Sequence, residues 1–170
     1  ISRKGHRFLI EAAPAILALH PDTCFLFLGE GEEEERLKSM VAEAGLEQHF
    51  TFAGYRENVG EILTVIDILL HPATMEGFAN VAMQALAAAK PVVSSAVGGM
   101  PEIVLDGETG ILVPPQNPAA IVDALDKLLS DSSLRDKLGR KGQQRVKEKF
   151  SVENMVANTL AVYEKILAEN

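Results

Sequence analysis

Residues 68–89 read ILLHPATMEGFANVAMQALAAA, and this stretch decides the fold. It opens with a short apolar run that is stopped by Pro72, and a long loop then leads to an alanine-rich segment, residues 78–89. A continuous apolar run is typical of a strand that is buried on both faces of a parallel sheet. The alanine-rich segment predicts a helix. The stretch therefore predicts a strand, a loop and a helix, the repeating unit of α/β folds.

The same alternation continues on both sides of this stretch. Apolar runs that predict further strands lie at residues 24–28, 50–53, 91–95 and 110–113. Patterns that predict helices lie between and beside them, at residues 4–20, 32–44, 57–66 and 100–105. From Pro118 onward only helices are expected, the last at residues 152–168. We therefore expect an α/β fold: a doubly wound parallel sheet of the Rossmann-like type, with helices on both faces and a helical C-terminal tail.

Composition limits the class of protein. The chain has 170 residues, 47% apolar and 24% charged, which suits a single domain, residues 1–170. The net charge of −8 disfavours nucleic acid as a partner. Cys24 is the only cysteine, which excludes an intrachain disulfide and a Cys-rich zinc site and favours a cytoplasmic setting. We expect no metal site, because no two of the histidines have metal-ligand spacing on one helix.

Ligands of doubly wound folds bind at the carboxyl ends of the strands, which directs attention to the loops that follow them. The loop at residues 29–31 resembles half of a dinucleotide fingerprint, but Glu34 stands where the third glycine belongs. The glutamates at residues 32–35 would also repel a pyrophosphate. Binding of NAD or FAD is therefore disfavoured, and the glutamate run is interpreted as the start of a surface helix.

The loop at residues 71–80 has the features of a binding site. Backbone N–H groups from Phe78 to Val81 would be unpaired at the start of the following helix and could bind an anion. Glu76 lies just before them, which suits a ligand that carries hydroxyl groups as well as phosphate. Gln84 lies about two helical turns further on, on a similar face. The alternative is that Glu76 only balances the helix dipole and Gln84 is a surface residue.

Other candidates are ambiguous from the residues alone. Arg3 and Lys4 could neutralise a diphosphate, or they could be solvated residues near a chain end. Residues 98–99, two glycines, could bring backbone close to a ligand or form a plain tight turn. His71 is expected at a strand end that faces the cleft, and His6 is expected at the surface.

Five segments, in order along the chain, together resemble a known family. They are residues 4–6, 76–81, 90–93, 98–104 and 106–115. The pattern is similar to the C-terminal half of the family-4, group 1 glycosyltransferases, from Lys4 to about Pro118. The resemblance implies the nucleotide-sugar-binding lobe of a GT-B enzyme, a hexosyltransferase that retains the anomeric configuration and needs no metal or cofactor.

The resemblance implies a role for three side chains. Lys4 corresponds to the family's lysine that holds the donor diphosphate, whereas the family's arginine lies upstream, and Arg3 does not obviously replace it. Glu76 corresponds to the first of two glutamates that have seven residues between them, and it would contact hydroxyls of the donor sugar. Gln84 stands in place of the second, which contacts the ribose. Catalytic roles are therefore expected for Lys4 and Glu76.

Further donor-binding positions follow from the same resemblance. The loop at residues 54–58 falls where the family binds the nucleotide base, so that Tyr55 or Arg56 could stack on it. Backbone contacts to the donor are expected from Gly77, Phe78, Ala79, Asn80, Val81, Gly98 and Gly99.

Two alanines depart from the family pattern. Ala79 stands where the family often has glycine, and Ala89 stands where it usually has glycine before Lys90-Pro91. An alanine costs free energy if its backbone needs a positive φ, and costs nothing at a helical φ.

The resemblance also implies what the 170 residues lack. The family's C-terminal lobe begins with a strand that is central in the sheet, and this chain begins after it. We therefore expect a gap between the strand that ends at Gly29 and the strand that ends at His71. We also expect a larger, two-lobe enzyme whose acceptor site lies mainly in the absent N-terminal lobe, so that the isolated domain is inactive.

The expected partners are the nucleotide-sugar donor and the absent N-terminal lobe of the same enzyme. No direct membrane contact is expected from this domain. The location is expected to be the cytoplasm, with the missing lobe making any contact with the inner face of a membrane. A homodimer could form through an apolar stripe on the last helix, Val156, Leu160, Tyr163 and Leu167.

The function that these observations favour is donor binding for sugar transfer in the synthesis of a glycan, polysaccharide or glycolipid. One alternative is a non-catalytic nucleotide-sugar-binding module, which Gln84 and Ala79 favour. A GT-B epimerase ranks lower.

Overall fold

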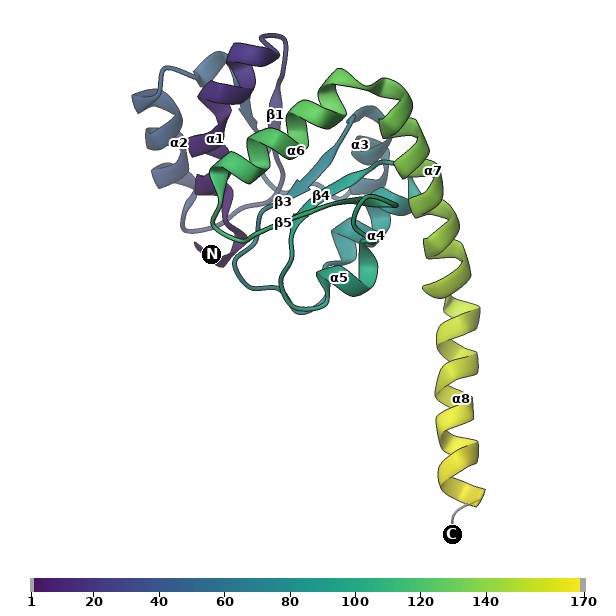
Figure 1. Ribbon diagram of the computed structural model, residues 1–170. Coiled ribbons are helices and arrows are strands. Elements are labelled where there is room, and N and C mark those ends of the chain that lie inside the picture. Colours follow the sequence, from purple (N-terminus) through teal and green to yellow (C-terminus); the bar gives the residue numbers. More distant parts are fainter. Residues whose placement is uncertain (1, 169–170) are drawn as a thin grey trace.

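The computed structural model describes residues 2–168, and its strands and helices alternate along the chain as expected (Figure 1). The strands are β1 (Phe25–Phe27), β2 (Phe50–Phe52), β3 (Leu69–His71), β4 (Val92–Ser95) and β5 (Gly110–Val113). The helices around them are α1 (His6–Leu19), α2 (Glu34–Glu43), α3 (Val59–Val65), α4 (Asn80–Ala87), α5 (Met100–Ile103) and α6 (Pro118–Ser130). Two 3-10 turns, η1 (Ser2–Lys4) and η2 (Glu47–His49), precede α1 and β2.

All strand pairs are parallel. β1 pairs with β2, with Leu26 opposite Thr51. β4 lies between β3 and β5, and Val93 is opposite both Leu70 and Ile111. The predicted α/β fold class is therefore confirmed, including the parallel arrangement that the continuous apolar runs indicated.

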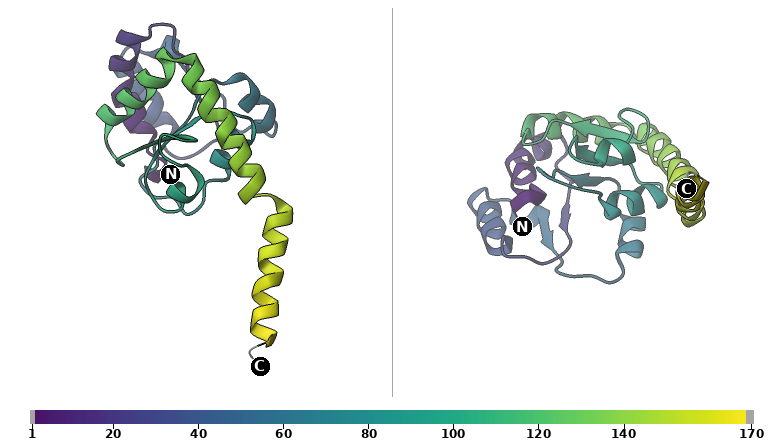
Figure 2. Two further views of the ribbon diagram at one scale, coloured as in Figure 1. Left: turned by 45° about the vertical axis from the view of Figure 1, so that its right-hand side comes forward. Right: turned by 90° about the horizontal axis from the view of Figure 1, so that it is seen from below.

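Helices cover both faces of the sheet because successive strand residues point to opposite sides (Figure 2). Val93 is buried with Ile16 of α1 and Ile121 of α6, in a cluster on one face. Val92 is buried with Leu86 of α4 in a second cluster that also contains residues of α3 and α5. Each face of β4 thus contributes to a separate apolar core.

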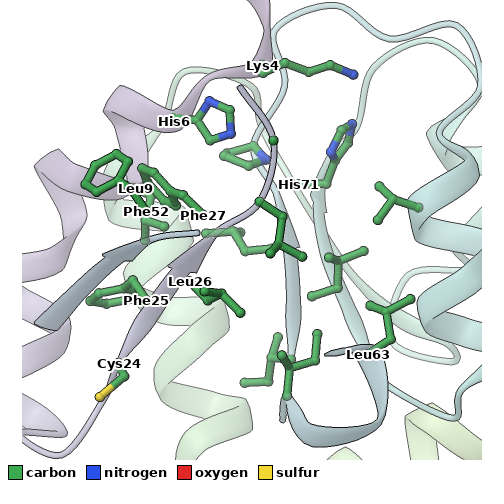
Figure 3. A pocket seen from close by; sticks show the side chains of 18 of the residues that line it. Lys4, His6, Leu9, Cys24, Phe25, Leu26, Phe27, Phe52, Leu63 and His71 are labelled. Atoms are coloured by element: carbon green, nitrogen blue, oxygen red, sulfur yellow. The ribbon is translucent and has the colours of Figure 1, made fainter. Parts of the chain in front are cut away.

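The strands form two sheets rather than one. Within residues 2–168, the order is β1-β2 in one sheet and β3-β4-β5 in the other, and no pairing joins β1 to β3. A cavity of about 1260 Å³ lies between them, with Leu26 on one side and Leu63 on the other (Figure 3). Leu26 is 40% exposed although it lies in the middle of a strand. The gap that was expected between β1 and β3 is therefore present.

Of the two C-terminal helices, the first packs against the domain and the second leaves it. α7 (Ser132–Lys149) packs against α4, and a Cβ on Gly139 would lie 1.9 Å from the carbonyl oxygen of Ala89. α7 begins directly after Asp131, whose carboxylate accepts a hydrogen bond from the Leu134 N–H at 2.9 Å. α8 (Val152–Ala168) has no buried residue and projects from the domain (Figure 1). No helix among the described residues has the length and apolar character needed to span a bilayer.

Candidate functional site

The start of α1 meets the loop between β3 and α4 at the carboxyl end of the sheet. The Thr74 N–H donates to the carbonyl oxygen of Arg3 at 2.8 Å. Gly5 has a φ of +72°, and a Cβ on it would lie 1.9 Å from the carbonyl oxygen of Pro72. Glycine is therefore needed at position 5 both for the backbone angle and for the close approach.

This contact brings together Lys4 and Glu76, the two side chains for which the family resemblance implies catalytic roles. Lys4 Nζ lies 2.7 Å from Glu76 Oε2, although 72 residues separate them along the chain. The Glu76 side chain is 14% exposed and that of Lys4 is 38% exposed. The bond from Lys4 is the main cause that holds the pKa of the Glu76 carboxyl below its ordinary value, and a bond from His71 acts in the same direction. Glu76 is therefore ionised at neutral pH.

Two histidines lie beside this pair, at one end of the cavity (Figure 3). His71 is the last residue of β3, as expected, and its Nε2 lies 3.0 Å from Glu76 Oε2. His6 was expected at the surface, but it is half-buried: its ring lies 5.0 Å from that of Phe27, and burial lowers its pKa. The signal that was missed is the helical spacing of His6 from buried residues. His6 lies three residues before Leu9 and seven before Ala13, and therefore on the buried face of α1.

The two glycines at positions 98 and 99 pack against the backbone of the loop that contains Glu76, here called the glutamate loop. The Gly99 N–H donates to the carbonyl oxygen of Gly77 at 2.9 Å. Gly98 has a φ of +53°, and a Cβ on it would lie 1.6 Å from the carbonyl oxygen of Glu76. The close approach that these glycines allow is therefore to the backbone of residues 76–77, and the suggested approach to a ligand stays a prediction.

The N-terminus of α4 lies next to this loop. Asn80, Val81 and Gln84 line the cavity, and Gln84 is exposed. No hydrogen bond found among the described residues uses the N–H of Asn80 or Val81, as the sequence predicted for the start of this helix. Ala79 is buried with a φ of −85°, so that no backbone strain attaches to it. Phe78 is 45% exposed, and its ring lies 6.0 Å from that of Phe150.

The loops that follow β1 and β2 form the opposite wall of the cavity. The Gly29 N–H donates to the carbonyl oxygen of Gly54 at 2.9 Å, which joins the two loops. Tyr55 and Arg56 are exposed there. They line the same cavity as Lys4, His71, Asn80, Val81 and Gln84. The predicted residues Glu76, Gly77, Phe78, Ala79, Gly98 and Gly99 do not line the cavity and lie beside it around the glutamate loop.

The arrangement defines a parallel α/β domain with cationic and anionic side chains and free amide groups at the carboxyl end of its strands. Over the part of the chain that the structure describes, no three His, Cys, Asp or Glu residues gather as a metal site. Lys4 and the first turn of α4 can bind an anion, and Glu76 can accept hydrogen bonds from hydroxyls.

Comparison with known proteins gives the family. Residues 1–145 match the model of the family described as glycosyl transferases group 1, and the chain belongs to this family. An uncharacterised glycosyltransferase of Methanocaldococcus jannaschii is 32% identical over 163 residues, which cover 95% of this chain and 42% of the relative.

Solved structures agree with this assignment. The C-terminal domain of a group 1 family glycosyl transferase from Francisella tularensis is 32% identical, with a TM-score of 0.80 over 89% of this chain and 82% of that one. Sucrose-phosphate synthase from Thermosynechococcus elongatus is 30% identical, with a TM-score of 0.84 over 99% of this chain and 44% of that one. The chain thus corresponds to the C-terminal domain of a GT-B glycosyltransferase and spans less than half the length of such full-length relatives.

Proposed function

We propose that the chain is the donor-binding part of a glycosyltransferase that moves a sugar from a nucleoside diphosphate sugar to an acceptor in glycan, polysaccharide or glycolipid synthesis. The observation that carries the proposal is the pair of Lys4 and Glu76, joined at 2.7 Å beside the N-terminus of α4. A cation and free N–H groups suit a diphosphate, and a carboxylate suits the hydroxyls of a sugar. A ligand that combines both groups is a nucleotide sugar.

Sugar transfer by this site would depend on electrostatics and positioning. Lys4 and the N–H groups of Asn80 and Val81 would stabilise the negative charge that develops on the leaving diphosphate. Glu76 would hold the sugar by its hydroxyls, and Gln84 would bind the ribose through its amide. Tyr55 or Arg56 would stack on the base. We propose that the reaction needs no metal and retains the anomeric configuration, as the resemblance to the family implies.

We also propose that chain preceding residue 1 supplies a strand between β1 and β3. Both strands present an unpaired edge to the cavity, and η1 lies at their carboxyl ends, where His6 contacts Phe27. A parallel strand that ended there would lead into α1 and return to β1 by the usual right-handed crossover. The acceptor would bind to a further N-terminal lobe, so that the isolated domain would be inactive. We propose a cytoplasmic location for the protein.

A titration of the complete protein with nucleotides tests the proposal. UDP, GDP, ADP and one sugar derivative of each would be titrated by calorimetry into the wild type and into Lys4→Ala, with Lys127→Ala as a control on the exposed surface of α6. We expect one nucleotide series to bind and to be weakened at least tenfold by Lys4→Ala alone. No binding, or equal loss in both variants, would contradict the proposal.

A second candidate function is a non-catalytic nucleotide-sugar-binding module, which the uncharged Gln84 favours. Such a module would bind the same donor but would transfer no sugar to any acceptor in the complete protein. A transfer assay with the nucleotide sugar that binds therefore separates the two functions.

A further inference from the structure

The two carboxylate oxygens of Glu76 have different surroundings. Oε2 accepts hydrogen bonds from Lys4 Nζ at 2.7 Å and from His71 Nε2 at 3.0 Å. Oε1 accepts only the N–H of the adjacent Gly77, at 3.2 Å, among the bonds that the structure describes. One oxygen is therefore anchored, and the other retains lone pairs for a ligand hydroxyl.

The bond between His71 and Glu76 fixes where the imidazole carries its hydrogen. An ionised carboxylate only accepts hydrogen bonds, so the hydrogen must lie on Nε2 of His71. Burial lowers the pKa of His71, and the bond to Glu76 opposes this without reversing it. His71 is thus a neutral donor at physiological pH, and its Nδ1 carries no hydrogen.

His71 is held more firmly than Lys4. It ends β3, where it is opposite Ser94 of β4, and the Ser94 hydroxyl donates to its carbonyl oxygen at 3.1 Å. The residue is 8% exposed and is followed by the buried Pro72. Lys4 has a long, flexible side chain that is 38% exposed. Of the two donors to Oε2, the imidazole is therefore the rigid one.

A bound diphosphate would compete for Lys4. The ammonium group would move towards the phosphates, and its bond to Glu76 would lengthen or break. His71 would then be the remaining donor to Oε2.

We propose that His71 is a positioning residue that holds Glu76 Oε2, so that Oε1 stays directed at a hydroxyl of the donor sugar when Lys4 binds the diphosphate. This inference rests on the proposed function and extends it to a residue that the sequence only placed at the edge of the cleft.

The test compares two variants of the complete protein that have nearly the same shape. His71→Gln keeps an N–H donor, and His71→Met has a side chain of the same length without one. The probes are UDP-glucose, UDP-N-acetylglucosamine, GDP-mannose and ADP-glucose, each with its free nucleoside diphosphate. For the probe that binds the wild type, we expect His71→Met to raise the Kd of the nucleotide sugar about tenfold. We expect little change for the nucleoside diphosphate, and recovery of most of the loss in His71→Gln.

A double-mutant cycle separates positioning from a structural effect. In the background of Glu76→Ala no carboxylate remains to be positioned, so His71→Met should then have less than about a twofold effect. The inference would be overturned if His71→Met raised the Kd by the same factor in the wild-type and Glu76→Ala backgrounds, or if His71→Gln and His71→Met lost equal affinity. Either result would leave the proposed function intact. If no probe binds the wild type, the proposed function fails and the inference fails with it.

A measurement on the wild-type protein does not depend on the folding of any variant. Nitrogen-15 NMR of the His71 imidazole at pH 7.5 should show the neutral tautomer with its hydrogen on Nε2. The other tautomer, or an imidazolium, would overturn the inference.

Discussion

Replacing Ala89 with glycine should stabilise the protein. Ala89 has a φ of +57°, in the left-handed region, at the turn between α4 and β4. Its N–H donates to the carbonyl oxygen of Leu86, and the N–H of Lys90 donates to that of Ala85, both at 2.9 Å. These two bonds form a Schellman motif, in which the left-handed position is usually glycine.

The magnitude follows from two opposing contributions. The left-handed conformation costs an L-residue roughly 1–2 kcal/mol, which glycine would not incur. Glycine makes the unfolded chain more flexible, which costs roughly 0.4–1 kcal/mol. The net gain in the free energy of unfolding is therefore about 1 kcal/mol, which raises the melting temperature by roughly 2–4 °C for a domain of this size.

Ala88→Gly is the matched control, because it makes the same chemical change one residue earlier. Ala88 has a φ of −80°, which alanine adopts without strain. Glycine there should destabilise the protein by roughly 0.5–1 kcal/mol. Scanning calorimetry of the complete protein measures both changes. If Ala89→Gly lowered the melting temperature as Ala88→Gly does, the argument from backbone strain would be refuted.

Three other substitutions and one pH change test further features of the structure. Gly98→Ala should lower the free energy of unfolding by about 2 kcal/mol or more, because the new Cβ would lie 1.6 Å from the carbonyl oxygen of Glu76. Gly60→Ala is the control and should not destabilise the protein, because a Cβ there meets nothing within 4 Å. Equal melting temperatures of the two variants would count against the close approach at Gly98. Burial lowers the pKa of His6 from its ordinary 6.5, so the unfolded chain binds more protons below that pH and stability should fall on acidification. His6→Leu should lessen this fall between pH 7 and 5.5, and an unchanged pH profile would show that His6 is not buried in solution.

Local patterns were sufficient to predict the elements of the fold. The strand at Leu69–His71 follows from an apolar run that ends at a proline, and a run without polar alternation requires burial on both faces. The gap between β1 and β3 was also expected, because the resemblance indicated which strand was absent. Strain at Ala89 was predicted only for the case that its φ is positive, because the sequence alone does not determine a backbone angle.

The site was predicted only in part, because family motifs indicate which residues belong to it but not which side chains touch. Lys4 and Glu76 were assigned to one donor site because each belongs to a motif of the family, but their direct contact was not predicted. The contact between His71 and Glu76 depends on how a loop folds back over the end of β3, and five residues of sequence spacing do not determine that path. His6 was missed because a polar residue at the start of a helix resembles a solvated one, and burial there depends on Phe27 from another element.

The most direct test of donor binding is a crystal structure of the complete protein with a bound nucleotide sugar. We expect the diphosphate to lie within hydrogen-bond distance of Lys4 Nζ and of the N–H groups at the start of α4. We also expect a sugar hydroxyl to donate to Glu76 Oε1 while His71 still holds Oε2. A nucleotide sugar bound elsewhere, with the pair of Lys4 and Glu76 intact, would contradict the account.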